Sequence, residues 1–73
     1  MDEKSKILVL FGQRVRQRRK ALGMSQEHFA LKCGLDRTYI SGIERGKRNV
    51  GLQNVKIIAD VLGITIAELF KDL

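Results

Sequence analysis

Apolar residues recur along most of this chain at intervals of three and four, the spacing that places them on one face of an α-helix. The chain has no proline, so nothing interrupts these stretches. The pattern predicts an all-α fold with helices over residues 4–22, 26–33, 37–45, 52–62 and 66–71. Two stripes are expected to face the core, and they consist of Phe11, Val15 and Leu22 in the first helix and Leu52, Val55, Ile58, Ala59 and Leu62 in the fourth.

Glycines and N-cap residues mark where these helices begin and end. A glycine follows four of the apolar stretches, as expected at a left-handed helix C-terminus, at Gly23, Gly34, Gly46 and Gly63. Two residues after three of these glycines stand Ser25, Asp36 and Thr65, whose side-chain oxygens can accept a hydrogen bond from the next helix. Apolar residues flank each cap at the spacing of a hydrophobic staple, and Thr65 with Glu68 fits a capping box.

The size and composition of the chain limit its possible functions. Seventy-three residues are expected to form a single domain, residues 1–73, too small for a large catalytic pocket. Cys33 is the one cysteine, which excludes an intramolecular disulfide, and His28 has no matched nucleophile or acid pair. We therefore expect neither an enzyme nor a metal or cofactor site. No membrane span or basic leader is evident, which predicts a cytoplasmic protein.

The positive charge is concentrated in the first two-thirds of the chain. The formal net charge is +6, and residues 1–50 hold twelve Lys and Arg against five Asp and Glu. The cations of the first helix are Arg14, Arg16, Arg18, Arg19 and Lys20. Such a field favours binding to a nucleic-acid phosphate backbone. The alternatives are a helix that is merely solvated or one that lies on an anionic membrane surface.

Residues 23–46 contain two short predicted helices separated by a glycine turn, which is the pattern of a DNA-binding helix-turn-helix. At 100° per residue, Ile40 and Ile43 define the buried side of the second of these helices. The opposite side is polar and is expected to carry Thr38, Ser41, Gly42 and Arg45, with Arg37 and Tyr39 on its flanks. This face is suited to contact base edges in the major groove. Glycine within a helix is unfavourable, so Gly42 predicts a close approach by DNA or, alternatively, by a protein helix.

The segment from Phe11 to Thr65 resembles the phage repressor and Cro-like helix-turn-helix family. The resemblance lies in VRQRRKALGMSQ, in Ala30 and Gly34, in YISGIERGKR and in IADVLGIT. The block LDRTYISGIERGKRN looks most like the controller proteins of restriction-modification systems. The resemblance implies a compact five-helix domain of the lambda-repressor-like type and a sequence-specific transcriptional regulator. A phage or chromosomal repressor of other genes, and an antitoxin-like protein-interaction module, remain alternatives, and RNA polymerase is a candidate second partner.

The family resemblance also implies roles for individual residues. Base contacts are expected from Arg37 and Thr38, with Ser41 on the same face, although the position of Gly42 often bears a base-contacting side chain in the family. Phosphate contacts are expected from Gln26, Tyr39, Lys47, Arg48 and Asn49. The alternative for Gln26 is an ordinary polar residue at the start of a helix. The family also pairs an arginine of the first helix with a glutamate of the recognition helix, which implies a structural ion pair between Arg19 and Glu44.

Some apolar positions of the last two helices fall outside the predicted core stripes. They are Ile57, Val61, Ile66 and Phe70, followed by Leu73. Such a patch predicts a homodimer interface that would place two recognition helices about one DNA turn, roughly 34 Å, apart on a palindromic site. The alternative is that the patch is covered within one chain by apolar residues of the first helix, Ile7, Leu8 and Leu10.

Overall fold

The computed structural model describes residues 3–73, and side chains from Lys6 onward. Within this range it contains five α-helices and no strand: α1 (Glu3–Ala21), α2 (Gln26–Cys33), α3 (Arg37–Glu44), α4 (Leu52–Leu62) and α5 (Ile66–Phe70). The all-α prediction is confirmed, and each helix begins and ends within one residue of the predicted bounds.

Local capping interactions explain why the helix ends were predictable. The side chains of Ser25, Asp36 and Thr65 accept hydrogen bonds from backbone N–H groups in the first turns of α2, α3 and α5. Thr65 also forms a complete capping box with Glu68. Gly63 has a φ of 73° and ends α4 by donating its N–H to carbonyls of that helix's last turn.

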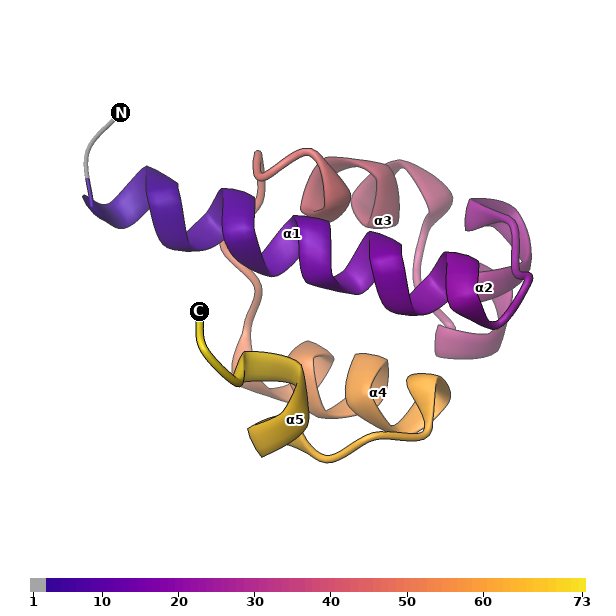
Figure 1. Cartoon of the computed structure of the whole chain (residues 1–73). Helices are drawn as coiled ribbons and strands as arrows, with labels where there is room; N and C mark the ends of the chain where they lie inside the picture. Colours follow the sequence, from indigo (N-terminus) through magenta and orange to yellow (C-terminus); the bar gives the residue numbers. More distant parts are fainter. Residues whose placement is uncertain (1–2) are drawn as a thin grey trace.

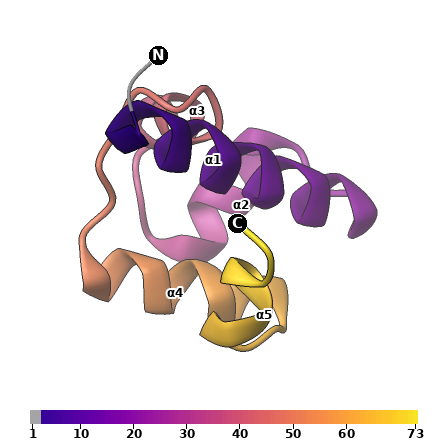
Figure 2. The ribbon, with the colours of Figure 1, turned by 60° about the vertical axis from the view of Figure 1, so that its left-hand side comes forward.

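The longest helix, α1, lies across the molecule and contacts α3, α4 and α5, while α2 contacts α3 and α4 (Figure 1). The turned view shows α4 and α5 below α1, with the C-terminal residues rising from α5 toward α1 (Figure 2). The largest fully buried side chains come from all five helices, and they are Phe29, Ile40, Ile43, Ile58, Leu69 and Val15. One hydrophobic core therefore fixes how the helices lie relative to one another.

Gly12 allows a close approach between α1 and the end of α3. A Cβ atom at residue 12 would lie 2.2 Å from the carbonyl oxygen of Ile43, so any larger residue would force the two helices apart. The sequence pattern did not indicate this contact, because a glycine inside an apolar helix has several possible explanations.

Two residues assigned to the core by their spacing lie at the surface instead. Leu22 is 53% exposed because α1 ends at Ala21, and Met24 takes the buried place after the turn. Leu52 is 79% exposed at the first position of α4, although Val55 of the same turn is buried. Helical spacing identifies a face, but it does not show how far along the helix that face is covered.

Candidate nucleic-acid interface

The N-terminus of α3 is held by Asp36. Its carboxylate accepts a hydrogen bond from the backbone N–H of Thr38 at 2.8 Å and a second from the Thr38 hydroxyl. These two bonds lower the pKa of Asp36 below its ordinary value. The Thr38 hydroxyl is therefore engaged with Asp36, and the methyl group is the part of Thr38 that suits an apolar contact.

The polar and apolar faces of α3 are well separated. Ile40 and Ile43 are buried, as predicted, while Arg37 and Thr38 are exposed. Ser41 is half-buried on the second turn. The solvent-facing side of α3 thus carries charged and hydroxyl-bearing side chains, and the most exposed of them lie in its first turn.

Gly42 does not lie on the open face, which corrects the prediction of a close approach by DNA or by another protein helix. It is buried beneath the side chain of Arg48, and a Cβ at residue 42 would lie 2.9 Å from the Cγ of Arg48. The loop that follows α3 folds back so that the aliphatic part of Arg48 crosses the helix at this glycine. Helical periodicity could not reveal this arrangement, because the covering residue comes from a loop.

The same loop places Arg48 against Tyr39. The guanidinium carbon of Arg48 lies 5.8 Å from the centre of the Tyr39 ring, within the range of a cation–π interaction. The Tyr39 hydroxyl accepts a hydrogen bond of 3.2 Å from the Nδ2 of Asn54, in the first turn of α4. Asn54 was missed by the sequence analysis because a polar residue near a helix start carries no specific signal. Lys47 and Asn49 of the loop are exposed.

Arg19 and Glu44 form a buried, bidentate ion pair between α1 and the end of α3. The Arg19 Nε lies 2.7 Å from the Glu44 Oε2, and its Nη2 donates to Oε1 at 2.9 Å. The Nη1 of Arg19 donates to the carbonyl of Met24 at 2.7 Å. The side chains are 8% and 2% exposed. This ion pair was implied by the family resemblance, and it ties α3 to α1.

Gln26, implied as a phosphate contact, also donates to the ion pair. Its Nε2 lies 3.1 Å from the Glu44 Oε1. A side-chain amide carries two N–H donors, so this bond leaves a second donor that could bind a phosphate oxygen. The contact fixes the orientation of Gln26 at the N-terminus of α2, where backbone N–H groups also favour an anion.

The cations of α1 are not equivalent, although the sequence analysis treated them as one basic field. Arg19 is buried in the ion pair, and Arg14 donates hydrogen bonds to backbone carbonyls at the end of α5. Arg16 and Lys20 are exposed, and Arg18 is half-buried. Two of these five cationic groups thus bond to other parts of the same chain, one of them in the core and one at the surface.

The predicted dimer patch is partly covered by its own chain. Ile57, Val61 and Ile66 are half-buried at the edge of the core, and Phe70 is 38% exposed. The Phe70 ring stacks on Phe11 of α1 with centroids 5.1 Å apart. The alternative of coverage by α1 therefore holds in part, and the patch retains an exposed edge at Phe70.

Three further features of residues 3–73 concern the requirements of a membrane span, a metal site and a reactive cysteine. No helix in residues 3–73 is long and apolar enough to cross a membrane, and no group of three His, Cys, Asp or Glu residues in that range could hold a metal ion. Cys33 is buried, and burial raises the pKa of its thiol to about 11. The neutral thiol is a core group rather than a nucleophile.

Comparisons with known proteins agree with this geometry. A family model described as helix-turn-helix matches residues 15–69. Control protein C.MunI of a Mycoplasma species is 50% identical over 68 residues, which cover 92% of this chain and 92% of that protein. The crystal structure of the restriction-modification controller protein C.AhdI from Aeromonas hydrophila superposes with a TM-score of 0.89 and 49% identity, over 94% of this chain and 100% of C.AhdI.

A third comparison is with a structure described as the master regulator for biofilm formation SinR in complex with DNA. It has a TM-score of 0.79 and 34% identity, and covers 84% of this chain and 98% of the SinR chain. On these matches, the chain belongs to the helix-turn-helix family that includes restriction-modification controller proteins.

Proposed function

We propose that this protein is a sequence-specific transcriptional regulator that binds a palindromic operator in double-stranded DNA as a homodimer and controls the genes of a restriction-modification system. It acts in the bacterial cytoplasm, on the nucleoid. The observation that carries the proposal is the polar, exposed first turn of α3, which is held rigidly by the Asp36 cap and by the Arg19–Glu44 ion pair.

Base contacts in this proposal come from the first two turns of α3. Arg37 is exposed and can donate two hydrogen bonds to guanine O6 and N7 in the major groove. Thr38 presents its methyl group, which suits the methyl of thymine, because its hydroxyl is bound to Asp36. Ser41 lies one turn further along the helix and can contact a base on the same side.

Phosphate contacts come from residues on either side of α3. Lys47, Arg48 and Asn49 extend from the loop after the helix, and Gln26 holds its second N–H at the start of α2. Tyr39 lies between Arg48 and Asn54, so its ring supports the Arg48 guanidinium beside the DNA backbone. Such contacts set the register of the protein on the duplex and make affinity depend on salt.

Two observations support the homodimer and the biological setting. Phe70 is 38% exposed, and Ile66, four residues earlier on α5, is half-buried, so both leave apolar surface that a second copy of the chain can cover. The match to C.MunI and C.AhdI extends over almost the whole chain, which favours the same kind of regulatory role. The SinR complex supports DNA as the ligand of the shared fold.

Selection of duplexes from a random DNA library tests the proposal. Purified protein would be incubated with the library at about 0.15 M salt, a physiological ionic strength, and the bound duplexes sequenced. We expect enrichment of a motif with two-fold symmetry and half-sites about one helical turn apart. Absence of any enriched motif would contradict sequence-specific binding and would favour a protein partner instead.

Two variants test the assignment of Arg37 as a base contact. Arg37→Ala should weaken binding to the selected site by roughly 1–3 kcal/mol and relax specificity at one base pair of each half-site. Lys56→Ala removes the same charge from an exposed ion pair with Asp60 on α4 and should leave the preferred sequence unchanged. Equal losses in both variants would show that Arg37 contributes only charge.

A further inference from the structure

Arg14 connects the middle of α1 to the end of α5 through backbone carbonyls. Its Nη1 lies 3.2 Å from the carbonyl oxygen of Glu68 and 3.3 Å from that of Leu69, and its Nη2 lies 2.9 Å from that of Lys71. These contacts span more than fifty residues of sequence. Arg14 is half-buried, and both of its terminal nitrogens donate to carbonyl oxygens of its own chain.

The α5 helix depends on such an interaction because it is short. It has five residues, and a helix of this length is not stable on its own in water. Beyond the helix, Glu68 and Phe70 accept bonds of 3.4 and 3.2 Å from the backbone N–H groups of Lys71 and Leu73. A positive charge at a helix C-terminus also interacts favourably with such carbonyls. Arg14 therefore adds three hydrogen bonds and a positive charge to the C-terminus of α5.

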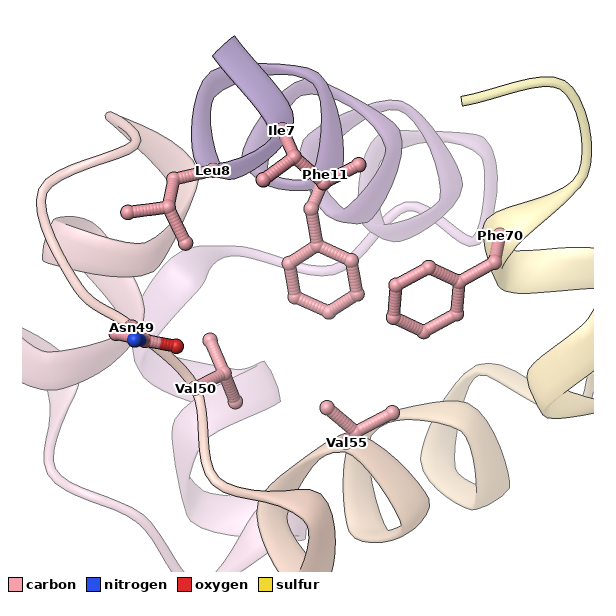
Figure 3. A pocket seen from close by; sticks show the side chains of 7 residues that line it. All are labelled: Ile7, Leu8, Phe11, Asn49, Val50, Val55 and Phe70. Carbon is pink, nitrogen blue, oxygen red and sulfur yellow. The ribbon is translucent and has the colours of Figure 1, made fainter. Parts of the chain in front are cut away.

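The second attachment of α5 lies one turn earlier on α1. Phe11 and Arg14 are three residues apart, and hence on one face of α1, and the Phe11 ring stacks on Phe70 at an interplanar angle of 25°. Figure 3 shows the two rings side by side at the edge of an apolar pocket of about 160 Å³. Leu73 lies against α1 as well, where it lines a shallow hollow with Ile7 and Leu10. The stacking fixes the Phe70 ring, and Arg14 fixes the backbone on both sides of it.

We infer that Arg14 is a positioning residue for the homodimer: by binding the carbonyls at the end of α5, it holds Phe70 in the orientation that a second copy of the chain would contact. The inference rests on the homodimer of the proposed function. It assigns to Arg14 a role in assembly, whereas its place in a basic helix had indicated phosphate binding. It also makes α1 the element that holds the α5 part of the dimer surface in place.

Sedimentation equilibrium of the full chain without DNA tests this role. The set comprises wild type, Arg14→Ala, Arg16→Ala and Phe70→Ala, each at a temperature where circular dichroism shows it fully folded. Arg16→Ala is the matched control, because it removes the same charge from an exposed position of the same helix. Phe70→Ala tests the surface itself.

The expected loss of dimer affinity follows from the fraction of chains in which α5 holds Phe70 in the orientation that the partner contacts. Both copies must be competent, so the dimer dissociation constant rises with the inverse square of that fraction, and a fall to about one third gives a roughly tenfold weaker dimer. We expect such a change in Arg14→Ala and in Phe70→Ala but not in Arg16→Ala. Arg14→Lys keeps the charge and some donors, and should restore part of the affinity.

Hydrogen exchange distinguishes positioning of α5 from general stability. In Arg14→Ala the amides of Leu69 and Phe70 should exchange faster while those of α3 are unchanged, because the bonds that are lost go to residues at the end of α5 and none goes to α3. Two results would overturn the inference but not the homodimer. One is unchanged hydrogen exchange in α5 of Arg14→Ala, and the other is an Arg14→Ala dimer as tight as wild type when the Phe70→Ala dimer is weakened. A wild-type monomer at micromolar concentration would contradict the homodimer, and the inference with it.

Discussion

Replacement of Glu44 by glutamine tests whether the buried ion pair holds the recognition helix in place. Glu44→Gln preserves the shape of the side chain but removes its charge and one of its two acceptor oxygens. In the native protein three donors point at this carboxylate: Nε and Nη2 of Arg19, and Nε2 of Gln26. In the variant the amide N–H₂ group would face one of these donors, and the Arg19 guanidinium, 8% exposed, would lose its counter-charge.

The cost of this substitution is large relative to the stability of the chain. Breaking a buried ion pair by removing one partner typically costs about 3–5 kcal/mol. At roughly 0.05–0.15 kcal/mol per residue, a domain of this length is stable by only about 4–11 kcal/mol. At roughly 4–8 °C per kcal/mol for a domain of this size, the melting temperature should fall by at least about 12 °C.

Thermal and urea unfolding followed by circular dichroism would measure the change. Glu27→Gln is the matched control, because Glu27 is exposed on α2, and it should change stability by no more than about 0.5 kcal/mol. Replacing both partners with apolar residues, Arg19→Met with Glu44→Leu, should recover much of the loss, since no unpaired charge would remain buried. A Glu44→Gln variant within about 1 kcal/mol of wild type would refute the view that the ion pair holds α1 and α3 together.

Three other substitutions or reactions test separate parts of the structure. Gly42→Ala should leave folding stability unchanged or raise it by up to about 1 kcal/mol through helix propensity, yet weaken operator binding in gel-shift assays, because the new methyl group displaces Arg48. Cys33 should resist iodoacetamide at pH 8 in the folded protein and react on unfolding in urea, because burial raises the pKa of its thiol to about 11. Mass spectrometry would measure the labelling, and rapid labelling of the folded protein would contradict this expectation. Hydrogen bonds from Thr65 lower the pKa of Glu68 in the folded state, so its stabilising contribution is complete above the unfolded pKa and is lost as pH falls through the folded value. Urea titrations at a series of acidic pH values should therefore show that the free energy of unfolding depends less on pH in Glu68→Gln than in wild type. The same pH dependence in both proteins would exclude this contribution.

The helices were predictable because their ends are determined locally. Asp36 and Thr65 satisfy N–H groups only two or three residues away, and Gly63 ends α4 by its own conformation, so a short window of sequence carries the whole signal. Predictions that depended on where the core ends were less successful. Leu22 and Leu52 continue their apolar stripes, but no other element covers them.

In the candidate site, too, features set by the local sequence were predictable, and features set by tertiary packing were not. The exposed first turn of α3 follows from helical periodicity, and the ion pair of Arg19 followed from the family resemblance. The covering of Gly42 by Arg48 could not be predicted, because the path of a loop is set by tertiary packing. The bonds from Arg14 to α5 were equally hidden, because backbone carbonyls are present at every residue and leave no pattern in the sequence. The roles of the individual DNA contacts stay predictions.

The attachment of both α3 and α5 to α1 has a consequence for the operator. Arg19 and Arg14 are five residues apart on one uninterrupted helix, which corresponds to about 7.5 Å along its axis. In the proposed dimer, the separation of the two recognition helices is then set by rigid helix geometry, without a hinge that could adjust it. One inserted base pair moves the half-sites by about 3.4 Å and rotates them by roughly 35°. We therefore expect binding to depend on the number of base pairs between the half-sites as strictly as it depends on the bases within them.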